Sequence, residues 1–192
     1  MLDRAVAKAT KTIDISLFER GWGNDGFHAT GGYLEDVLNS ARQTKGDILE
    51  AGSGLTTLLL NLVAPGRAWT LEHSPEFYSR TVKTLKRYNL DSSRVLLAPL
   101  EDFGEFVWYS PPRDLPICDL VIADGPPGDT KGGRYGLLPR MRESLSQTAM
   151  ILLDDAQREG ELTTLKQWQD RFGIHYTLKN SGDRAWACCR FN

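Results

Sequence analysis

Short apolar runs alternate with helical segments along most of this chain. The runs have the length of buried strands and lie at residues 47–51, 68–72, 94–98, 119–123 and 149–153. Strands joined through helices run parallel to one another within a sheet. The tail, IHYTLKNSGDRAWACCRF, reads as two strands around a turn. We therefore predict an α/β fold: a doubly wound, mostly parallel seven-stranded sheet with an antiparallel C-terminal edge hairpin and helices on both faces.

The remaining segments are assigned from spacing and turn residues. Residues 33–43 place apolar side chains at helical spacing, and residues 101–108 are predicted as a short helix before Pro111-Pro112. Residues 1–33, which end in a glycine-rich stretch, are predicted to form an N-terminal loop or lid. A chain of 192 residues suits one domain, which we expect over residues 34–192.

The composition is typical of a globular protein in a reducing compartment. Three cysteines without a CxxC pattern argue against a disulfide framework or a structural zinc site and favour the cytoplasm. The N-terminus lacks the apolar core of a signal peptide or membrane span, so no membrane partner is expected. A net charge of -2, with no long block of one sign, argues against a nucleic-acid partner.

Residues 47–57, DILEAGSGLTT, join the first of these strands to the helix that follows through a glycine turn. Such crossovers bind nucleotides, and their ligands lie outside the carboxyl ends of the strands. The turn lacks the GxGxxG dinucleotide pattern and the GK[ST] of a P-loop, and Glu50 would repel a phosphate that it faced. A cationic, sugar-bearing ligand fits better, because Glu72 ends the second strand and can accept both hydroxyls of a ribose.

Together these features resemble class I S-adenosylmethionine-dependent methyltransferases, in which an acid ends the first strand and a GxGxG-like turn follows. The resemblance covers residues 34–192 and implies a Rossmann-like domain whose glycine turn lies against the methionine part of the cofactor. It also implies that Glu72 holds the ribose and that the backbone of Leu100 lies beside the adenine. Pro99 stands where many members have an aspartate, which leaves recognition of the adenine amine to Glu101. The residues expected to bind S-adenosylmethionine are Glu50, Gly52, Ser53, Gly54, Thr56, Glu72, His73, Leu100, Glu101 and Asp124.

Acidic residues follow the fourth and fifth predicted strands: Asp124 after one, Asp154 and Asp155 after the other. Three carboxylates brought together repel one another unless a cation neutralises them, and all-oxygen ligand sets suit Mg²⁺ or Ca²⁺. The layout resembles the catechol-type branch of O-methyltransferases, which implies a metal at Asp124, Asp154 and Asp155 that activates a hydroxyl of the acceptor. Asp155 departs from the catechol pattern, which has an amide there. A metal-free site is the open alternative, in which Asp124 or Asp155 is catalytic and takes a proton.

Candidate acceptor contacts lie in two loops. KGGRYG, residues 131–136, carries two basic residues and a tyrosine among glycines, which suits an anion-binding flap and makes Arg134 and Tyr135 candidate substrate contacts. Trp22, Phe27 and His28 are further candidates from the N-terminal segment. Whether that segment closes the site or pairs two copies as a homodimer stays open.

The sequence thus predicts an S-adenosylmethionine-dependent methyltransferase that acts on a small molecule, at oxygen, by in-line methyl transfer. A nicotinamide-dependent oxidoreductase on a similar sheet is one alternative. The absence of GxGxxG and of a Tyr-x-x-x-Lys pair argues against it. A non-catalytic S-adenosylmethionine-binding module is another, and the polar residues after the fourth strand argue against that.

Overall fold

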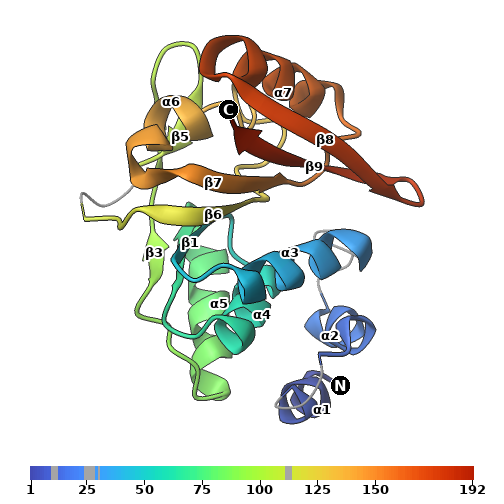
Figure 1. Ribbon diagram of the computed structural model, residues 1–192. Coiled ribbons are helices and arrows are strands. Elements are labelled where there is room, and N and C mark those ends of the chain that lie inside the picture. Colours follow the sequence, from blue (N-terminus) through green and yellow to red (C-terminus); the bar gives the residue numbers. More distant parts are fainter. Residues whose placement is uncertain (10–12, 24–28, 30, 111–113) are drawn as a thin grey trace.

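The computed structural model of the chain describes residues 1–9, 13–23, 29, 31–110 and 114–192. Its central sheet has seven strands in the order β3-β2-β1-β6-β7-β9-β8 (Figure 1). The strands from β3 to β7 in this order are parallel, whereas β9 is antiparallel to both β7 and β8. The predicted fold class is therefore confirmed. The strands are β1 Asp47–Ala51, β2 Ala68–Glu72, β3 Val95–Leu97, β6 Cys118–Ala123, β7 Leu145–Leu153, β8 Ile174–Ser181 and β9 Arg184–Phe191.

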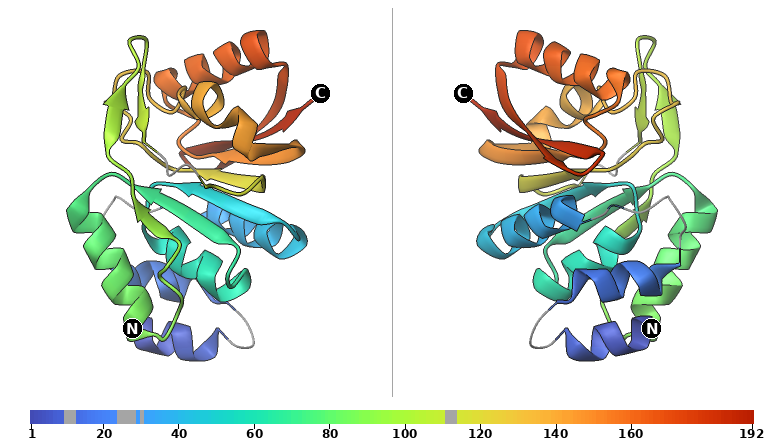
Figure 2. Two further views of the ribbon diagram at one scale, coloured as in Figure 1. Left: turned by 90° about the vertical axis from the view of Figure 1, so that its left-hand side faces the viewer. Right: turned by 90° about the vertical axis from the view of Figure 1, so that its right-hand side faces the viewer.

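Helices cover both faces of the sheet (Figures 1 and 2). One face carries α3, α4 and α5, and the opposite face carries α6, the short 3-10 helix η1 and α7. The side chains of each strand alternate between the two resulting cores: Leu120 and Ile122 face one, Val121 and Ala123 the other. No helix within the described ranges is long and apolar enough to cross a membrane. The helices of the domain are α3 Gly31–Gln43, α4 Leu55–Val63, α5 Pro75–Arg87, α6 Leu137–Met141, η1 Arg142–Ser144 and α7 Glu159–Phe172.

Helices occur in the N-terminal segment where the sequence analysis predicted a loop. These are α1 (Leu2–Lys8) and α2 (Ile15–Trp22), which lie on the side of α3, α4 and α5 (Figure 1). Asp14 caps α2, because its Oδ1 accepts a hydrogen bond from the backbone N–H of Leu17 at 3.1 Å. The buried side chains of α2 extend the core beneath α3 and α4. Phe27 and His28 lie outside the described residues.

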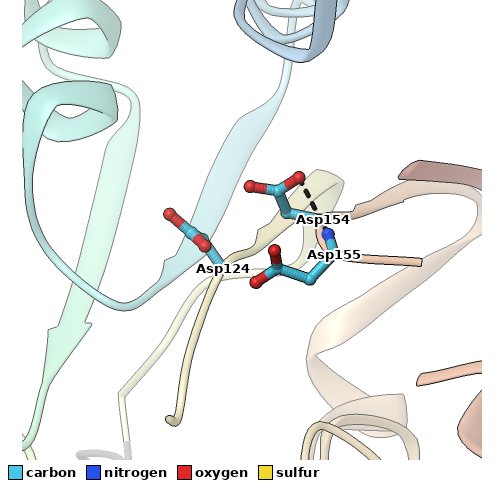
Figure 3. Close-up of side chains that lie close together, drawn as sticks. All are labelled: Asp124, Asp154 and Asp155. Atoms are coloured by element: carbon cyan, nitrogen blue, oxygen red, sulfur yellow. Dashed lines mark hydrogen bonds between the residues drawn. The ribbon is translucent and has the colours of Figure 1, made fainter. Parts of the chain in front are cut away.

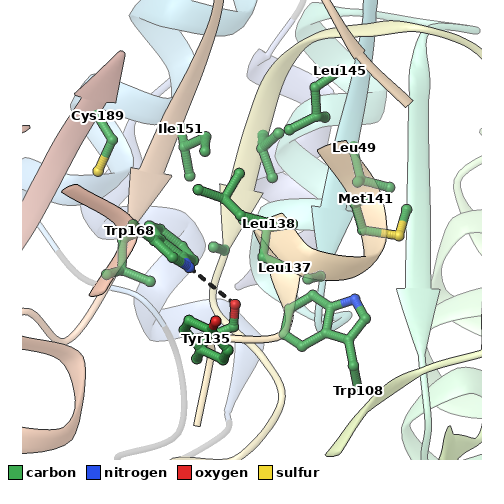
Figure 4. Close-up of a cluster of buried hydrophobic side chains, with 14 of the residues drawn as sticks. Leu49, Trp108, Tyr135, Leu137, Leu138, Met141, Leu145, Ile151, Trp168 and Cys189 are labelled. Atoms are coloured by element: carbon green, nitrogen blue, oxygen red, sulfur yellow. Dashed lines mark hydrogen bonds between the residues drawn. The ribbon is translucent and has the colours of Figure 1, made fainter. Parts of the chain in front are cut away.

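The prediction of a helix over residues 101–108 was wrong. Two short antiparallel strands, β4 (Leu100–Asp102) and β5 (Val107–Tyr109), form a separate hairpin there. The turn between them has Gly104 at φ +85°, with its N–H donated to Asp102 Oδ1 at 2.8 Å. Trp108 anchors the hairpin in the core that contains α6 and α7 (Figure 4). A helix over this stretch would lose that anchor, so burial of the aromatic side chains outweighs local helix propensity.

Candidate active site

A cavity of about 620 Å³ opens where the central strands β1, β2, β6 and β7 end. Its wall is built from the glycine turn after β1, the acid that ends β2, and the loops that follow β6 and β7. Trp22 and Ala29 add an apolar wall from the N-terminal segment. This is the edge at which open α/β sheets bind ligands, because the loops there converge from several strands. The residues predicted from the strand ends are thus brought together by the sheet itself.

The two glycines of the turn have different structural roles. Gly52 has φ +91°, and a Cβ there would lie 3.1 Å from the backbone nitrogen of Gly125 in the loop after β6. Glycine at this position therefore permits both the backbone conformation and the close approach of two loops. Gly54 lines the cavity, and a Cβ on it would meet no described atom within 4 Å. Glycine at position 54 keeps space in the cavity open.

Glu72 is held in place by donors from two loops. Its Oε2 accepts hydrogen bonds from the backbone N–H and the hydroxyl of Ser53 at 2.9 and 2.8 Å, and its Oε1 accepts the N–H of Ser74 at 2.7 Å. The carboxylate lines the cavity although the residue is only 3% exposed. His73 lines the cavity as well, with its Nδ1 3.2 Å from Glu72 Oε1. Glu72 therefore fixes the glycine turn to β2 and presents lone pairs to a ligand.

Glu50 lies beneath the turn and outside the cavity lining. Its Oε2 accepts hydrogen bonds from the hydroxyls of Thr57 and Thr70, both at 2.7 Å, and its Oε1 is buried without a partner in the described chain. Burial raises the pKa of Glu50 to about 7, against the opposing effect of the hydroxyls of Thr56, Thr57 and Thr70. Thr56 is also buried, in the first turn of α4, and does not line the cavity. Of the residues predicted around this turn, Ser53 and the two glycines line the cavity.

The hairpin contributes Tyr109 to the cavity, a residue that the sequence analysis missed. Tyr109 is fully buried, its hydroxyl has no partner among the described residues, and a Cβ on Gly125 would clash with that hydroxyl. Its ring meets His73 edge-on, with centroids 6.1 Å apart. Burial, followed by the charge of Glu72, raises the pKa of Tyr109, so the hydroxyl stays a donor. Leu100 and Glu101 lie on β4 outside the lining.

The three predicted aspartates come together in the part of the cavity wall that the loops after β6 and β7 form, here called the acid end. One carboxylate oxygen from each of Asp124, Asp154 and Asp155 lies within 4.8 Å of the others (Figure 3). Asp154 Oδ1 accepts the backbone N–H of Asp155 at 2.8 Å, and Asp155 has φ +58°. Burial, and then the neighbouring Asp154, raises the pKa of Asp124; burial, and then Asp155, raises that of Asp154. Carboxylates that are buried this close together need a compensating positive charge inside the protein.

Arg134 supplies a large part of that compensation. Its guanidinium is 2% exposed and lies 3.0 Å from Asp155 Oδ2 and 3.4 Å from Asp124 Oδ1, measured from Nη2. Nη2 also donates to the backbone oxygen of Asp124 at 2.8 Å, and Nη1 donates to that of Asp154. Although burial alone would lower it, the pKa of Arg134 is raised by the surrounding acids, of which Asp124 contributes most and Glu161 comes next. Arg134 therefore lines the cavity, as predicted, but its donors bind the protein's own oxygens.

Two further arginines bind Asp155 at the rim of the cavity. Arg158 Nη1 lies 2.9 Å from Asp155 Oδ2, and Arg184 Nη1 lies 3.2 Å from Oδ1. Their side chains are 48% and 38% exposed, and both residues line the cavity. The spacing of three residues between Asp155 and Arg158 was a usable sequence signal. Arg184 lies on β9, which follows α7 and β8 in the chain, and no sequence signal linked it to Asp155.

Tyr135 lies in the core and not in the cavity wall. It is 6% exposed, and its hydroxyl lies 2.7 Å from Nη1 of Arg171, which donates to it. Its backbone oxygen accepts the indole N–H of Trp168 at 2.9 Å (Figure 4). These contacts fix the backbone next to Arg134. The structure thus separates the two neighbouring residues predicted as substrate contacts, with Arg134 at the cavity and Tyr135 packed behind it.

Similar proteins are found by structure and not by sequence. No protein-family model matches the chain, and no curated protein is similar to it at a significant level. A putative caffeoyl-CoA O-methyltransferase from Staphylococcus aureus matches with a TM-score of 0.70 at 12% identity, over 94% of each chain. The O-methyltransferase TomG from Streptomyces achromogenes, solved with SAM, matches with a TM-score of 0.65 at 13% identity, over 99% of this chain and 90% of that one.

A methyltransferase named for a tRNA substrate is similar in structure as well. The tRNA (m1A58) methyltransferase TrmI from Aquifex aeolicus matches with a TM-score of 0.60 at 17% identity, over 92% of this chain and 74% of its own. Fold similarity at such identities does not identify the substrate, because proteins of one fold have many different functional sites. The matches extend over most of this chain. The chain therefore has the fold of the class I S-adenosylmethionine-dependent methyltransferases.

Proposed function

We propose that this protein is an S-adenosylmethionine-dependent methyltransferase that acts on a small hydroxylated acceptor. The observation that carries the proposal is a single cavity lined both by the glycine turn and Glu72, here called the glycine-turn end, and by Asp124 and Asp154 of the acid end. A volume of about 620 Å³ lies within the range of about 300 to 1,000 Å³ common for small-molecule sites. A methyl donor and its acceptor have to meet within one such space.

The residues at the glycine-turn end suit S-adenosylmethionine. The space in front of Gly54 is open, Glu72 presents carboxylate oxygens for ribose hydroxyls, and Tyr109 has a hydroxyl in need of a partner. The apolar side chains of Trp22 and Phe77 line the same cavity and suit the adenosine. When bound, S-adenosylmethionine supplies a methyl group with a good leaving group on sulfur.

The acid end supports a role in activating the acceptor. Asp124 faces the cavity from the loop after β6, with a side chain that is 27% exposed, and its pKa is raised by burial and by Asp154. A carboxylate with a raised pKa is a better acceptor for a hydroxyl proton, so Asp124 is the proposed general base. An oxygen acceptor follows from this assignment, since hydroxyls gain nucleophilicity on deprotonation. Asp155, the second predicted catalytic residue, is instead bound by arginines and is assigned a positioning role.

The rim of the cavity favours an acceptor that carries a negative group. Arg158 and Arg184 bind Asp155 through Nη1, and no other hydrogen bond of their guanidinium groups is found within the described chain. The remaining N–H groups can therefore donate to a carboxylate or phosphate on the acceptor. We propose hydroxylated organic anions as the acceptor class.

Calorimetric titration with S-adenosylhomocysteine and, separately, NADH tests the cofactor. Binding of the homocysteine compound alone is expected; binding of NADH alone would reject the proposal in favour of an oxidoreductase. Release of S-adenosylhomocysteine is then measured with hydroxylated acids and with their neutral methyl esters. Turnover of the acids but not of the esters is expected. Binding of the cofactor product with no turnover of any acceptor would indicate a non-catalytic binding module.

Asp124→Asn separates chemistry from binding. The variant is expected to bind S-adenosylhomocysteine as the wild type does and to lose about 100-fold or more in kcat, the usual size of a general-base contribution. Asp129→Asn is the matched control, because Asp129 lines the same cavity from the same loop without joining the acid cluster. A kcat unchanged in Asp124→Asn would reject the role of Asp124.

A further inference from the structure

We propose that Arg134 is a built-in cation that takes the place of a divalent metal ion in the acid cluster, so that the native protein binds no metal there. Considered alone, the three carboxylates of Asp124, Asp154 and Asp155 form a plausible ligand set for Mg²⁺ or Ca²⁺. Considered with their surroundings, they do not fit that role. The reason is the guanidinium of Arg134, which contacts the acids and cannot be inferred from their spacing in the sequence.

One guanidinium contacts all three acidic residues. Nη2 of Arg134 lies 3.0 Å from Asp155 Oδ2, 3.4 Å from Asp124 Oδ1 and 2.8 Å from the backbone oxygen of Asp124, while Nη1 donates to the backbone oxygen of Asp154. Backbone oxygens near such acids are themselves common ligands of hard cations. Arg134 therefore satisfies oxygens that a bound metal ion would otherwise use.

Asp155 has no oxygen left for a metal ion. Its Oδ2 is bound by Arg134 and Arg158, and its Oδ1 by Arg184 and the side-chain amide of Gln157. A divalent cation would have to displace some of these donors. It would also lie close to the positive charge of Arg134, which is repulsive in a site of low dielectric constant.

The position of Arg134 is fixed from behind by α7. Nη1 lies 3.7 Å from Oε1 of Glu161, a residue that is 2% exposed and has no role in the proposed chemistry. Gly133, next to Arg134, has φ +51°, and a Cβ there would lie 3.6 Å from that same carboxylate. The bond from Trp168 to the backbone of Tyr135 holds the other side of Arg134. A guanidinium anchored in this way is part of the fold and does not exchange with solvent ions.

A fixed guanidinium would organise the acids differently from a metal ion. Arginine stays charged and donates along fixed directions, and it offers no open coordination position for an acceptor oxygen. Arg134 is therefore a positioning residue: it holds Asp155 and the loop after β6 together and leaves Asp124 at the cavity wall. The acceptor would then be held by the rim arginines and its proton taken by a carboxylate.

Metal binding by the 192-residue chain tests this proposal without cofactor or acceptor, so the result does not depend on the proposed methyltransferase activity. Wild-type protein treated with EDTA is titrated calorimetrically with Mg²⁺, Ca²⁺ and Mn²⁺, and its Tm is measured with each ion at millimolar concentration. No binding and no change in Tm are expected. In Arg134→Met the carboxylates of Asp124 and Asp154, with the backbone oxygens that Arg134 releases, are expected to bind a divalent ion, which raises the Tm of the variant towards that of the wild type.

Arg171→Met is the matched control, because Arg171 contacts Tyr135 from the solvent side and does not reach the acids. It is expected to gain no metal binding. Stoichiometric metal binding by the wild type that is lost in Asp154→Asn would overturn the proposal, and so would a folded Arg134→Met that binds no metal. Should Arg134→Met fail to fold, the wild-type titration with its Asp154→Asn comparison still decides, and Arg134→Lys, which keeps a cation, is expected to remain metal-free.

Discussion

The two ends of the cavity hold their carboxylates in opposite ways. At the glycine-turn end, Glu72 is fixed by two backbone N–H groups and a hydroxyl, of which Ser53 supplies two and Ser74 one. At the acid end, Asp155 is fixed by arginines from the loop after β6, from the start of α7 and from β9. Neutral donors leave the charge of Glu72 available to a ligand, whereas the arginines largely cancel the charge of Asp155. The first end is suited to binding and the second to holding a geometry.

The largest expected effect follows from removing the cation of the acid end. Arg134→Met removes the ion-pair partner of the buried Glu161 and of Asp124 and is expected to lower the free energy of unfolding by about 3 to 5 kcal/mol, the usual cost of breaking a buried pair. Arg171→Met removes pairs on a side chain that is 53% exposed and should cost less than about 1 kcal/mol. Urea unfolding of both variants without metal measures the difference. Equal losses would mean that Arg134 is no more important to the fold than a surface residue.

Glu50 extends the comparison to the acid beneath the glycine turn, through the pH dependence of stability. Its pKa of about 7 in the folded protein lies above the ordinary value of 4.5, so the folded state holds a proton that the unfolded state releases first. The stability from this group is fully present below pH 4.5 and is lost as pH rises through about 7. Glu50→Gln mimics the protonated form and should remove that loss, on the order of 3 kcal/mol.

Urea unfolding of the ligand-free proteins at about pH 5 and about pH 8 measures the effect. The free energy of unfolding of Glu50→Gln, relative to that of the wild type, should be higher at about pH 8 than at about pH 5. Parallel stability curves for the two proteins over this range would show that Glu50 is ionised in the folded state.

Glu72→Gln tests whether the glycine-turn end is a binding end. The variant keeps the shape of the side chain but replaces one carboxylate oxygen with an NH₂ group, which cannot accept a hydrogen bond. Ser53 and the ribose hydroxyls would therefore lose a charged acceptor. Affinity for S-adenosylhomocysteine is expected to fall by about 30- to 100-fold, which corresponds to about 2 to 3 kcal/mol, as for a lost hydrogen bond to a charged group. Glu76→Gln, on the exposed first turn of α5, is the calorimetric control. Equal affinities of the two variants would contradict the ribose role.

The two glycines of the turn give the smallest and most local test. Gly52→Ala places a Cβ at φ +91° and against Gly125, so it should cost about 1 to 3 kcal/mol of stability. Gly54→Ala meets no described atom and should change stability little, while it weakens S-adenosylhomocysteine binding by filling cavity space. Thermal unfolding and calorimetry on both variants separate the two effects. A destabilised Gly54→Ala with normal binding would reverse the roles assigned here.

Much of the fold was predictable because its signals are local. Five apolar runs separated by helices determine a parallel sheet, and the strand ends then identify Gly52, Gly54, Glu72, Asp124 and Asp154 as neighbours of one edge. The exceptions have a common cause. Residues 101–108 form a hairpin because Trp108 and Tyr109 find a core to fill, and the N-terminal helices exist because α2 finds a surface to cover. Neither partner surface is visible from the segment itself.

The sequence alone determined which residues reach the edge of the sheet, because strands and helices are recognised from the pattern of apolar residues over a few consecutive positions. Only the tertiary structure decided what each carboxylate is bound to. Arg134 was noticed as a basic residue in a flexible-looking loop, yet folding buries it between Asp155 and Glu161, which lie 21 and 27 residues further along the chain. Ion pairing depends on distance in space and on burial, and neither can be read from spacing along the chain.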